Sequence, residues 1–134
     1  MQRAIPSFPT TSAFVAVCAI AFLVVGLRPN LAAGDPAAGR QVFAECSGCH
    51  ATAPGVNKIG PSLAGVVGRQ SGTAAGYDYS SAMKSADITW DDDTLDKFLA
   101  GPAGLVHGTK MFVSVPNSAD RQNVIAYLAT LKGR

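Results

Sequence analysis

The feature that most constrains this chain is the pentapeptide Cys46-Ser47-Gly48-Cys49-His50, which places two thiols and an imidazole within five residues. A disulfide between cysteines three apart closes a loop too short to stabilise a fold by much. The third cysteine of the sequence lies well upstream, in an apolar segment. The pentapeptide is therefore interpreted as a device that holds a ligand, and the rest of the chain decides which ligand.

The first 33 residues differ in composition from the rest. Residues 13–27 form an unbroken apolar run of 15 residues, preceded by a single charge at Arg3. As a helix this run spans about 22 Å, short of the roughly 30 Å hydrocarbon core of a bilayer. Small residues follow at 32–34, as at a signal-peptide cleavage site, although Leu31 stands where a small residue is usual. The sequence predicts that residues 1–33 are a secretory signal peptide, with a retained N-terminal anchor as the alternative.

The charge balance changes once this leader is set aside. The whole chain has eleven Lys and Arg against nine Asp and Glu, a formal net charge of +2. Arg3 and Arg28 precede residue 34, so nine basic residues and all nine acids lie in residues 34–134, where their charges cancel. A neutral domain lacks the basic surface by which proteins bind nucleic acids. We therefore expect no nucleic-acid partner.

Residues 34–134 contain few regular elements. Helix signals occur at an Asp35–Pro36 start, at residues 80–86, at residues 91–100, and at a last helix beginning at Asn117 or Ser118. Gly101 and Pro102 end the third of these, and residues 51–76 and 104–116 show little helical period. No segment alternates like a strand, so an all-α domain is predicted. Loops this long count against an ordinary core, and they suit a domain that wraps a large apolar ligand.

The spacing C-x-x-C-H is the attachment signature of c-type haem. Two thiols on one helical turn can add across the two vinyl groups of a porphyrin, and the next residue, a histidine, then reaches the iron. A structural disulfide does not need that histidine, and a thioredoxin-like site sits in a βαβ pattern that this sequence lacks. Structural zinc needs four ligands, and His107 is the only further Cys or His downstream. The sequence predicts one covalent haem c, with a redox dithiol or zinc as weaker alternatives.

The ligand on the other side of the iron stays open on the residues alone. The candidates are Met111, Met83, His107, a lysine, or no protein ligand. A thioether favours ferrous iron and raises the reduction potential, whereas a second histidine gives a lower potential. A methionine can equally fill a gap in an apolar core.

From residue 34 to residue 132 the chain resembles the class I cytochromes c, in particular the bacterial proteins that resemble mitochondrial cytochrome c. The resemblance rests on these segments in this order: GDPAAGRQVF, CSGCH, KIGPSLAGVVGR, GYDYSSA, ITW, GTKM and VIAYLATLK. It implies the class I cytochrome c fold, in which short helices and long loops wrap one covalent haem c. It further implies that Cys46 and Cys49 form the thioether bonds and that His50 and Met111 are the axial iron ligands.

The resemblance also implies a set of residues around the haem. The carbonyl of Pro61 would accept the imidazole N–H of the axial histidine and increase its donor strength. Arg69, Tyr79 and Trp90 would lie around a buried haem propionate, offering charge or hydrogen-bond donors. Thr109 would face the second propionate.

The chain departs from the family pattern at several positions. Phe98 stands where a tyrosine is usual near the methionine, Met83 where an asparagine is frequent, and His107 where a proline usually precedes GTKM. Residues 103–105 lack the lysines that relatives present around the exposed haem edge. The remaining candidates for a positive edge are Lys58, Lys84, Lys97 and Lys110. Docking is therefore expected to be less sensitive to salt than in lysine-rich relatives.

These features predict an electron-transfer protein and not an enzyme. With both axial positions filled by protein there is no vacant site for a substrate, so the function is to exchange one electron at a time. The resemblance implies quinol–cytochrome c reductase and a terminal oxidase or photosynthetic reaction centre as partners. The domain at residues 34–134 is expected to be a monomer in the bacterial periplasm, and to contact the inner membrane only if the leader tethers it. The alternatives are a peroxidase-like or gas-binding haem protein with a displaceable methionine, and a fixed subunit of a membrane complex.

Overall fold

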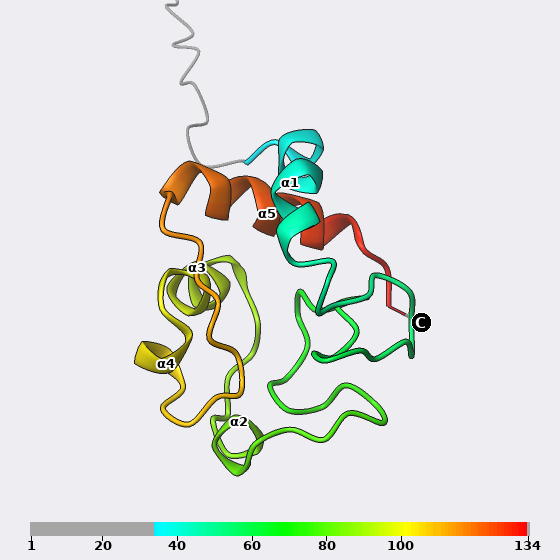
Figure 1. Ribbon diagram of the computed structural model, residues 1–134, viewed down its shortest axis with the longest axis vertical. Coiled ribbons are helices and arrows are strands. Elements are labelled where there is room, and N and C mark those ends of the chain that lie inside the picture. The colour runs from blue at the N-terminus through cyan, green and yellow to red at the C-terminus, as the bar shows by residue number, and fades with distance from the viewer. Residues whose placement is uncertain (1–33, 134) are drawn as a thin grey trace, which may run out of the picture.

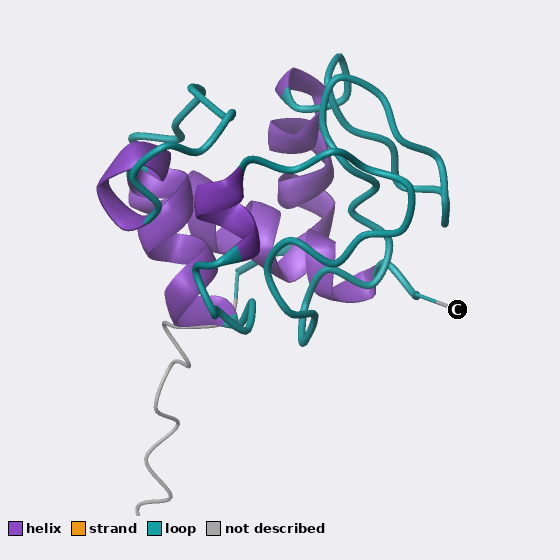
Figure 2. Ribbon diagram, turned by 90° about the horizontal axis from the view of Figure 1, so that it is seen from below, coloured by secondary structure: helices purple, strands orange, loops and turns teal. Residues whose placement is uncertain are grey.

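The computed structural model describes residues 34–133, which form short helices joined by long loops (Figure 1). The helices are α1 (Pro36–Val42), the 3-10 turn η1 (Phe43–Glu45), α2 (Ser81–Lys84), α3 (Asp92–Ala100), α4 (Pro102–Leu105) and α5 (Ser118–Thr130). Between 34 and 133 the nearest approach to a sheet is one isolated antiparallel bridge, which joins Gln70 to Thr89. The prediction of an all-α domain is confirmed, and loops form a large part of the surface (Figure 2).

Side-chain caps fix where the helices begin. The Asp35 carboxylate accepts a hydrogen bond of 2.8 Å from the Ala37 N–H, and Pro36 takes the first helical position of α1. Asp91 and Thr94 form a reciprocal capping box at the start of α3. Because each cap satisfies amide groups that have no partner inside the helix, these starts are set by local sequence.

Helix α4 differs from what the sequence predicts. Gly101 and Pro102 were expected to end α3 and lead into irregular chain that includes Gly104. The chain does leave α3 at Gly101, where the backbone is extended, but a new helix begins at once at Pro102. The fixed φ of proline suits a first helical position as well as a helix stop, so the same dipeptide ends one helix and begins the next.

Helices α1 and α5, the first and the last of the domain, cross in direct contact (Figure 1). A Cβ added at Gly39 would lie 1.9 Å from the Asn123 carbonyl oxygen, so the two backbones approach as closely as glycine permits. The rings of Phe43 and Tyr127 pack beside this crossing with centroids 5.4 Å apart. The Asp35 N–H donates to the Asn123 side chain over 2.8 Å, which joins the start of α1 to α5.

Gly39→Ala is expected to lower the free energy of unfolding of the haem-loaded protein by more than about 3 kcal/mol, the upper end of the usual cost of overpacking. The added methyl group would meet the main chain of α5 and not a movable side chain. Guanidinium denaturation followed by fluorescence measures the change. Gly104→Ala is the matched control, since a Cβ there has no neighbour within 4 Å. Equal stability of the two variants would contradict close packing at this crossing.

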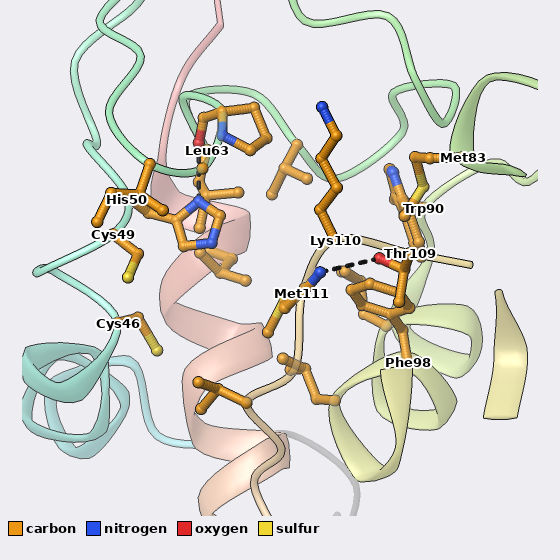
Figure 3. A pocket seen from close by; sticks show the side chains of 18 of the residues that line it. Cys46, Cys49, His50, Leu63, Met83, Trp90, Phe98, Thr109, Lys110 and Met111 are labelled. Carbon is orange, nitrogen blue, oxygen red and sulfur yellow. Dashed lines mark hydrogen bonds between the residues drawn. The ribbon is translucent and has the colours of Figure 1, made fainter. Parts of the chain in front are cut away.

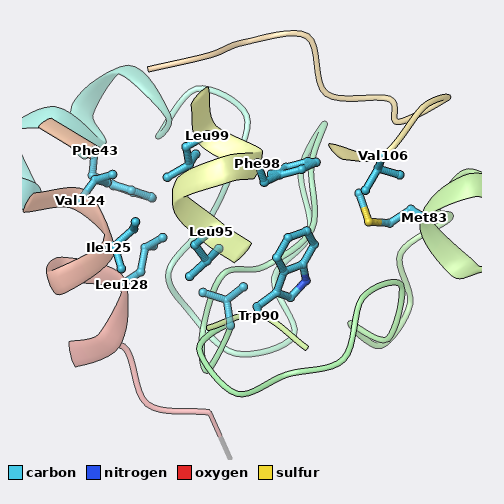
Figure 4. Packing of buried hydrophobic residues seen from close by; sticks show 11 residues of the cluster. Phe43, Met83, Trp90, Leu95, Phe98, Leu99, Val106, Val124, Ile125 and Leu128 are labelled. Atoms are coloured by element: carbon cyan, nitrogen blue, oxygen red, sulfur yellow. The ribbon is translucent and has the colours of Figure 1, made fainter. Parts of the chain in front are cut away.

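A buried apolar cluster joins the helices to the loops (Figure 4). Its members are Phe43, Val66, Met83, Trp90, Leu95, Phe98, Leu99, Val106, Val124, Ile125 and Leu128. Most of these side chains also line one large cavity, so the core of the protein surrounds a space and does not fill it. None of the helices in residues 34–133 combines the length and hydropathy needed to cross a bilayer.

Candidate haem site

The cavity has a volume of about 280 Å³, and apolar side chains form most of its wall. Cys46, Cys49 and His50 lie on one side of it, and Thr109 and Met111 lie on the other (Figure 3). The described residues therefore bring together the pentapeptide and the GTKM segment, which lie far apart in the sequence. Every residue that the resemblance implies for the haem surroundings lines this cavity.

The pentapeptide follows η1 in a hydrogen-bonded turn. The amide N–H of Cys49 donates to the Cys46 carbonyl over 3.0 Å, and that of His50 donates to the same carbonyl over 2.9 Å. This turn holds both cysteines on the cavity wall, where their side chains are partly buried. Burial, followed by the charge of Glu45, raises the pKa of the Cys46 thiol.

The imidazole of His50 is oriented by its hydrogen bond to Pro61. Nδ1 lies 2.8 Å from the Pro61 carbonyl oxygen. A carbonyl oxygen can only accept, so Nδ1 bears the proton and the lone pair is on Nε2. Burial lowers the pKa of His50, which favours this neutral form. An imidazole with one nitrogen held in this way is arranged as a metal ligand.

Gly60 makes the position of this ring possible. A Cβ at Gly60 would lie 2.4 Å from Cε1 of His50, closer than any real side chain tolerates. The Gly60 amide donates to the Cys49 carbonyl over 2.8 Å, which ties the following loop back to the pentapeptide. The sequence analysis did not assign Gly60 a role, and its place in KIGP directly before Pro61 was the available signal.

The segment around Met111 is held from both of its ends. The amide of Met111 donates to the Thr109 hydroxyl over 3.2 Å, and Thr109 is itself buried. Farther along, the Val115 amide donates to the Leu99 carbonyl of α3 over 2.7 Å. His107, the other nitrogen donor considered for the iron, is exposed and is not part of the cavity wall.

Arg69 presents an unpaired donor to the cavity wall. Its two terminal nitrogens each donate over 3.1 Å, one to the Ala64 carbonyl and one to the Ser62 carbonyl. Its Nε is buried and, within residues 34–133, has no hydrogen-bond partner. Burial lowers the pKa of this guanidinium and raises the pKa of the Tyr79 hydroxyl, because removal from water disfavours the charged form of each group. A partly buried guanidinium with a free, buried N–H is arranged to meet an anion.

The far wall of the cavity is apolar. Trp90 and Phe98 pack with ring centroids 5.0 Å apart, and Met83 is buried nearby with 7% of its surface exposed (Figures 3 and 4). Phenylalanine and methionine place no strong hydrogen-bonding group at these two positions of the wall. The side chains of Phe98 and Met83 therefore offer a bound group an apolar surface.

Comparison with known proteins identifies the family. The family model for cytochrome c matches residues 36–132. Cytochrome c2 of Rhodoblastus acidophilus is 48% identical over 102 residues, which are 75% of this chain and 95% of that protein. The chain belongs to the class I cytochrome c family. It is accordingly an electron-transfer protein that binds one covalent haem c, and Cys46 and Cys49 occupy the C-x-x-C-H positions.

Other class I cytochromes c give the same result. Cytochrome c2 of Rhodomicrobium vannielii is 49% identical over 105 residues, covering 77% of this chain and 84% of that protein. The solved structure of cytochrome cH from Methylobacterium extorquens matches with a TM-score of 0.69 at 43% identity, covering 72% of this chain and 99% of that chain. The predictions of family, fold and cofactor are confirmed. The prediction of a leader at residues 1–33 lies outside the described residues and stays a prediction.

The residues present fit a haem. The cavity wall combines two thiols, which would bond the two vinyl groups, an imidazole and a thioether, which could hold the iron, and an apolar lining that suits the porphyrin ring. The unpaired Nε of Arg69 fits a buried carboxylate at the cavity wall. When bound, the haem supplies an iron that gains and loses one electron.

Proposed function

We propose that this protein is a periplasmic single-haem electron carrier in which His50 and Met111 are the axial iron ligands and Cys46 and Cys49 form the thioether bonds. The observation that carries the proposal is the pair of donors in one apolar cavity. His50 offers Nε2 because Nδ1 is committed to Pro61, and Met111 is the sulfur donor held in the segment on the other side. With both donors on the iron no position would be left for a substrate, and electron exchange would be its chemistry.

Four further residues of the cavity, Arg69, Tyr79, Trp90 and Thr109, offer donors to the carboxylates of the haem. Arg69 and Tyr79 form one pair: the guanidinium supplies charge and the hydroxyl, which accepts from the Ala74 amide over 3.3 Å, keeps its own proton to donate. Trp90 adds an indole N–H, and Thr109 a hydroxyl, on the same wall. Burying carboxylates among these donors holds the group in one orientation. The apolar wall around Met83 and the soft sulfur ligand both favour ferrous iron, so a positive reduction potential is proposed.

Partners and location are proposed from the resemblance. The donor is a quinol–cytochrome c reductase and the acceptor a terminal oxidase or a photosynthetic reaction centre. The domain at residues 34–134 acts as a monomer in the periplasm, and a retained segment at residues 1–33 would tether it to the inner membrane. In support, its relatives include proteins named cytochrome c2 that match over nearly their whole length.

Absorption spectroscopy of the fully oxidised protein tests the axial ligands. We expect the weak far-red band of sulfur-to-iron charge transfer at neutral pH, because the thioether of Met111 is on the iron. Added imidazole should leave the band in place at low concentration, since the sixth position is filled. An oxidised protein with covalent haem and no far-red band would overturn the methionine assignment and favour the peroxidase-like or gas-binding alternative.

A further inference from the structure

Large apolar side chains are exposed around the mouth of the haem cavity. Ile59 is 77% exposed, Phe112 is 89% exposed and Val113 is 58% exposed, and all three also line the cavity. Ile59 lies on the loop that leads to Pro61, and Phe112 and Val113 directly follow Met111. The three residues, called the apolar rim below, thus border the cavity from two separate segments. Exposed apolar groups gathered at one site indicate a binding surface.

Two lysines near this rim, Lys84 and Lys110, share one acidic partner, Asp78. Lys110 Nζ lies 3.1 Å from Oδ2 of Asp78 and donates to the Asp78 carbonyl over 2.6 Å. Lys84 Nζ lies 3.6 Å from Oδ1 of the same carboxylate. The hydrogen bond and charge of Lys110, and then the charge of Lys84, hold the pKa of Asp78 below its usual range. The Asp78 carboxylate is therefore charged at neutral pH. One acid therefore cancels half of the charge of two of the four candidate lysines.

The other two candidate lysines add little to the mouth. The ammonium group of Lys58 donates to the carbonyl of Ser47, which turns it towards the pentapeptide loop. Lys97 is exposed on α3 and is not part of the cavity wall. The charge of residues 34–134 as a whole is balanced. The mouth thus presents apolar surface with a weak positive field around it.

We propose that the apolar rim is the docking surface for a redox partner whose own docking face is apolar and weakly charged, and that Asp78 keeps the surrounding lysines from selecting an acidic partner. The inference rests on the proposed function, since electrons leave through the mouth of this cavity. A partner ringed by carboxylates would gain little from Lys84 and Lys110, which already share a carboxylate, while its charges would be desolvated against Ile59 and Phe112. An apolar face gains by covering the rim, and salt does not screen that gain.

Gold electrodes coated with monolayers of defined chemistry stand in for the two kinds of partner. Holoprotein is adsorbed on methyl-terminated and on carboxylate-terminated alkanethiol monolayers, and voltammetry measures the electroactive coverage at rising salt. We expect coverage on the methyl surface to persist at high salt, and coverage on the carboxylate surface to be smaller and to be lost. Phe112→Ser and Ile59→Ser should each lower coverage on the methyl surface about tenfold or more at limiting protein concentration.

Two further variants separate the contributions of the rim and of Asp78. Val56→Ser is the matched control, because Val56 is 47% exposed but is not part of the cavity wall; its coverage should equal that of the original protein. Asp78→Asn should increase coverage on the carboxylate surface severalfold at low salt only, by releasing the charges of Lys84 and Lys110. Ile59→Ser lies away from Met111 in sequence, so the rim can be tested without altering the methionine segment.

Failure of the docking inference is distinguishable from failure of the proposed function. A positive reversible potential and a far-red band, measured in solution for each variant, report the function alone. With these intact, preference of the original protein for the carboxylate surface, or equal coverage by the rim variants and Val56→Ser, would overturn the docking inference. Sedimentation equilibrium showing a dimer that Phe112→Ser dissociates would overturn it too, because a second copy would then occupy the rim.

Discussion

A chain with both Cys46→Ala and Cys49→Ala is expected to lose its tertiary structure when its haem is extracted with acidified organic solvent, whereas the original protein keeps its haem under the same treatment. The reason is the size of the cavity within the core. At roughly 24 cal/mol per Å³, an empty cavity of about 280 Å³ costs about 7 kcal/mol, which is comparable to the roughly 5–15 kcal/mol that stabilises a whole domain. The buried Nε of Arg69 would also be left without the haem carboxylate proposed as its partner. Near-ultraviolet circular dichroism before and after extraction measures the loss.

Two comparisons make this first prediction specific. Ser47→Ala lies between the same cysteines and removes only a hydrogen bond of 2.7 Å to the Ala44 carbonyl, so this variant should keep both its haem and its fold. Adding free haem back to the extracted double variant should restore the near-ultraviolet signal, because His50 and the apolar wall remain. An extracted double variant with native dichroism and a cooperative thermal transition would show that the helices can fill the cavity themselves.

The second large effect is expected from Met111→Ala. This variant should lose the far-red band, bind added imidazole at the vacated position, and have a lower reduction potential. For a one-electron couple about 59 mV corresponds to a tenfold change in relative ligand affinity, and we expect a decrease greater than this. The direction follows because the thioether favours ferrous iron. Spectroelectrochemical titration measures the potential and the band in the same sample.

The other methionine of the cavity provides the control. Met83 is buried in the same wall and has the same side chain, so Met83→Leu tests for effects of methionine loss that do not involve the iron. Leucine has nearly the same volume, and the cost in stability should be less than about 1.5 kcal/mol. Its far-red band should remain. If Met83→Leu abolished the band while Met111→Ala kept it, the axial assignment would move to Met83.

Local chemistry explains why much of the fold could be predicted from the sequence. A capping side chain acts on amides two or three residues away, so the starts of α1 and α5 follow from Asp35 and Asn117 alone. The prediction of haem attachment at the pentapeptide is equally local, because it depends only on the spacing of three side chains within one turn. The start of α4 was missed because proline is compatible with two outcomes, and the choice at Pro102 depends on the packing of the next turn.

Contacts between distant residues account for what the sequence could not predict. In the sequence Asp78 resembles any surface acid. The residues next to it give no sign that Lys110, 32 positions away, forms a hydrogen bond with its carboxylate. Likewise the sequence around Ile59 gives no sign that this apolar side chain is exposed at the cavity mouth. The resemblance supplied Pro61 as a partner of His50, and the hydrogen bond between them agrees with it.

The crossing of α1 on α5 sets an order of events during biogenesis. α1 finds its partner only when α5 has been made, and α5 ends at Thr130, 80 positions after His50. Val124 and Leu128 of α5 form part of the cavity wall, so this wall is missing until α5 docks. The packing that completes the domain therefore leaves both cysteines accessible for haem attachment until its last helix is in place.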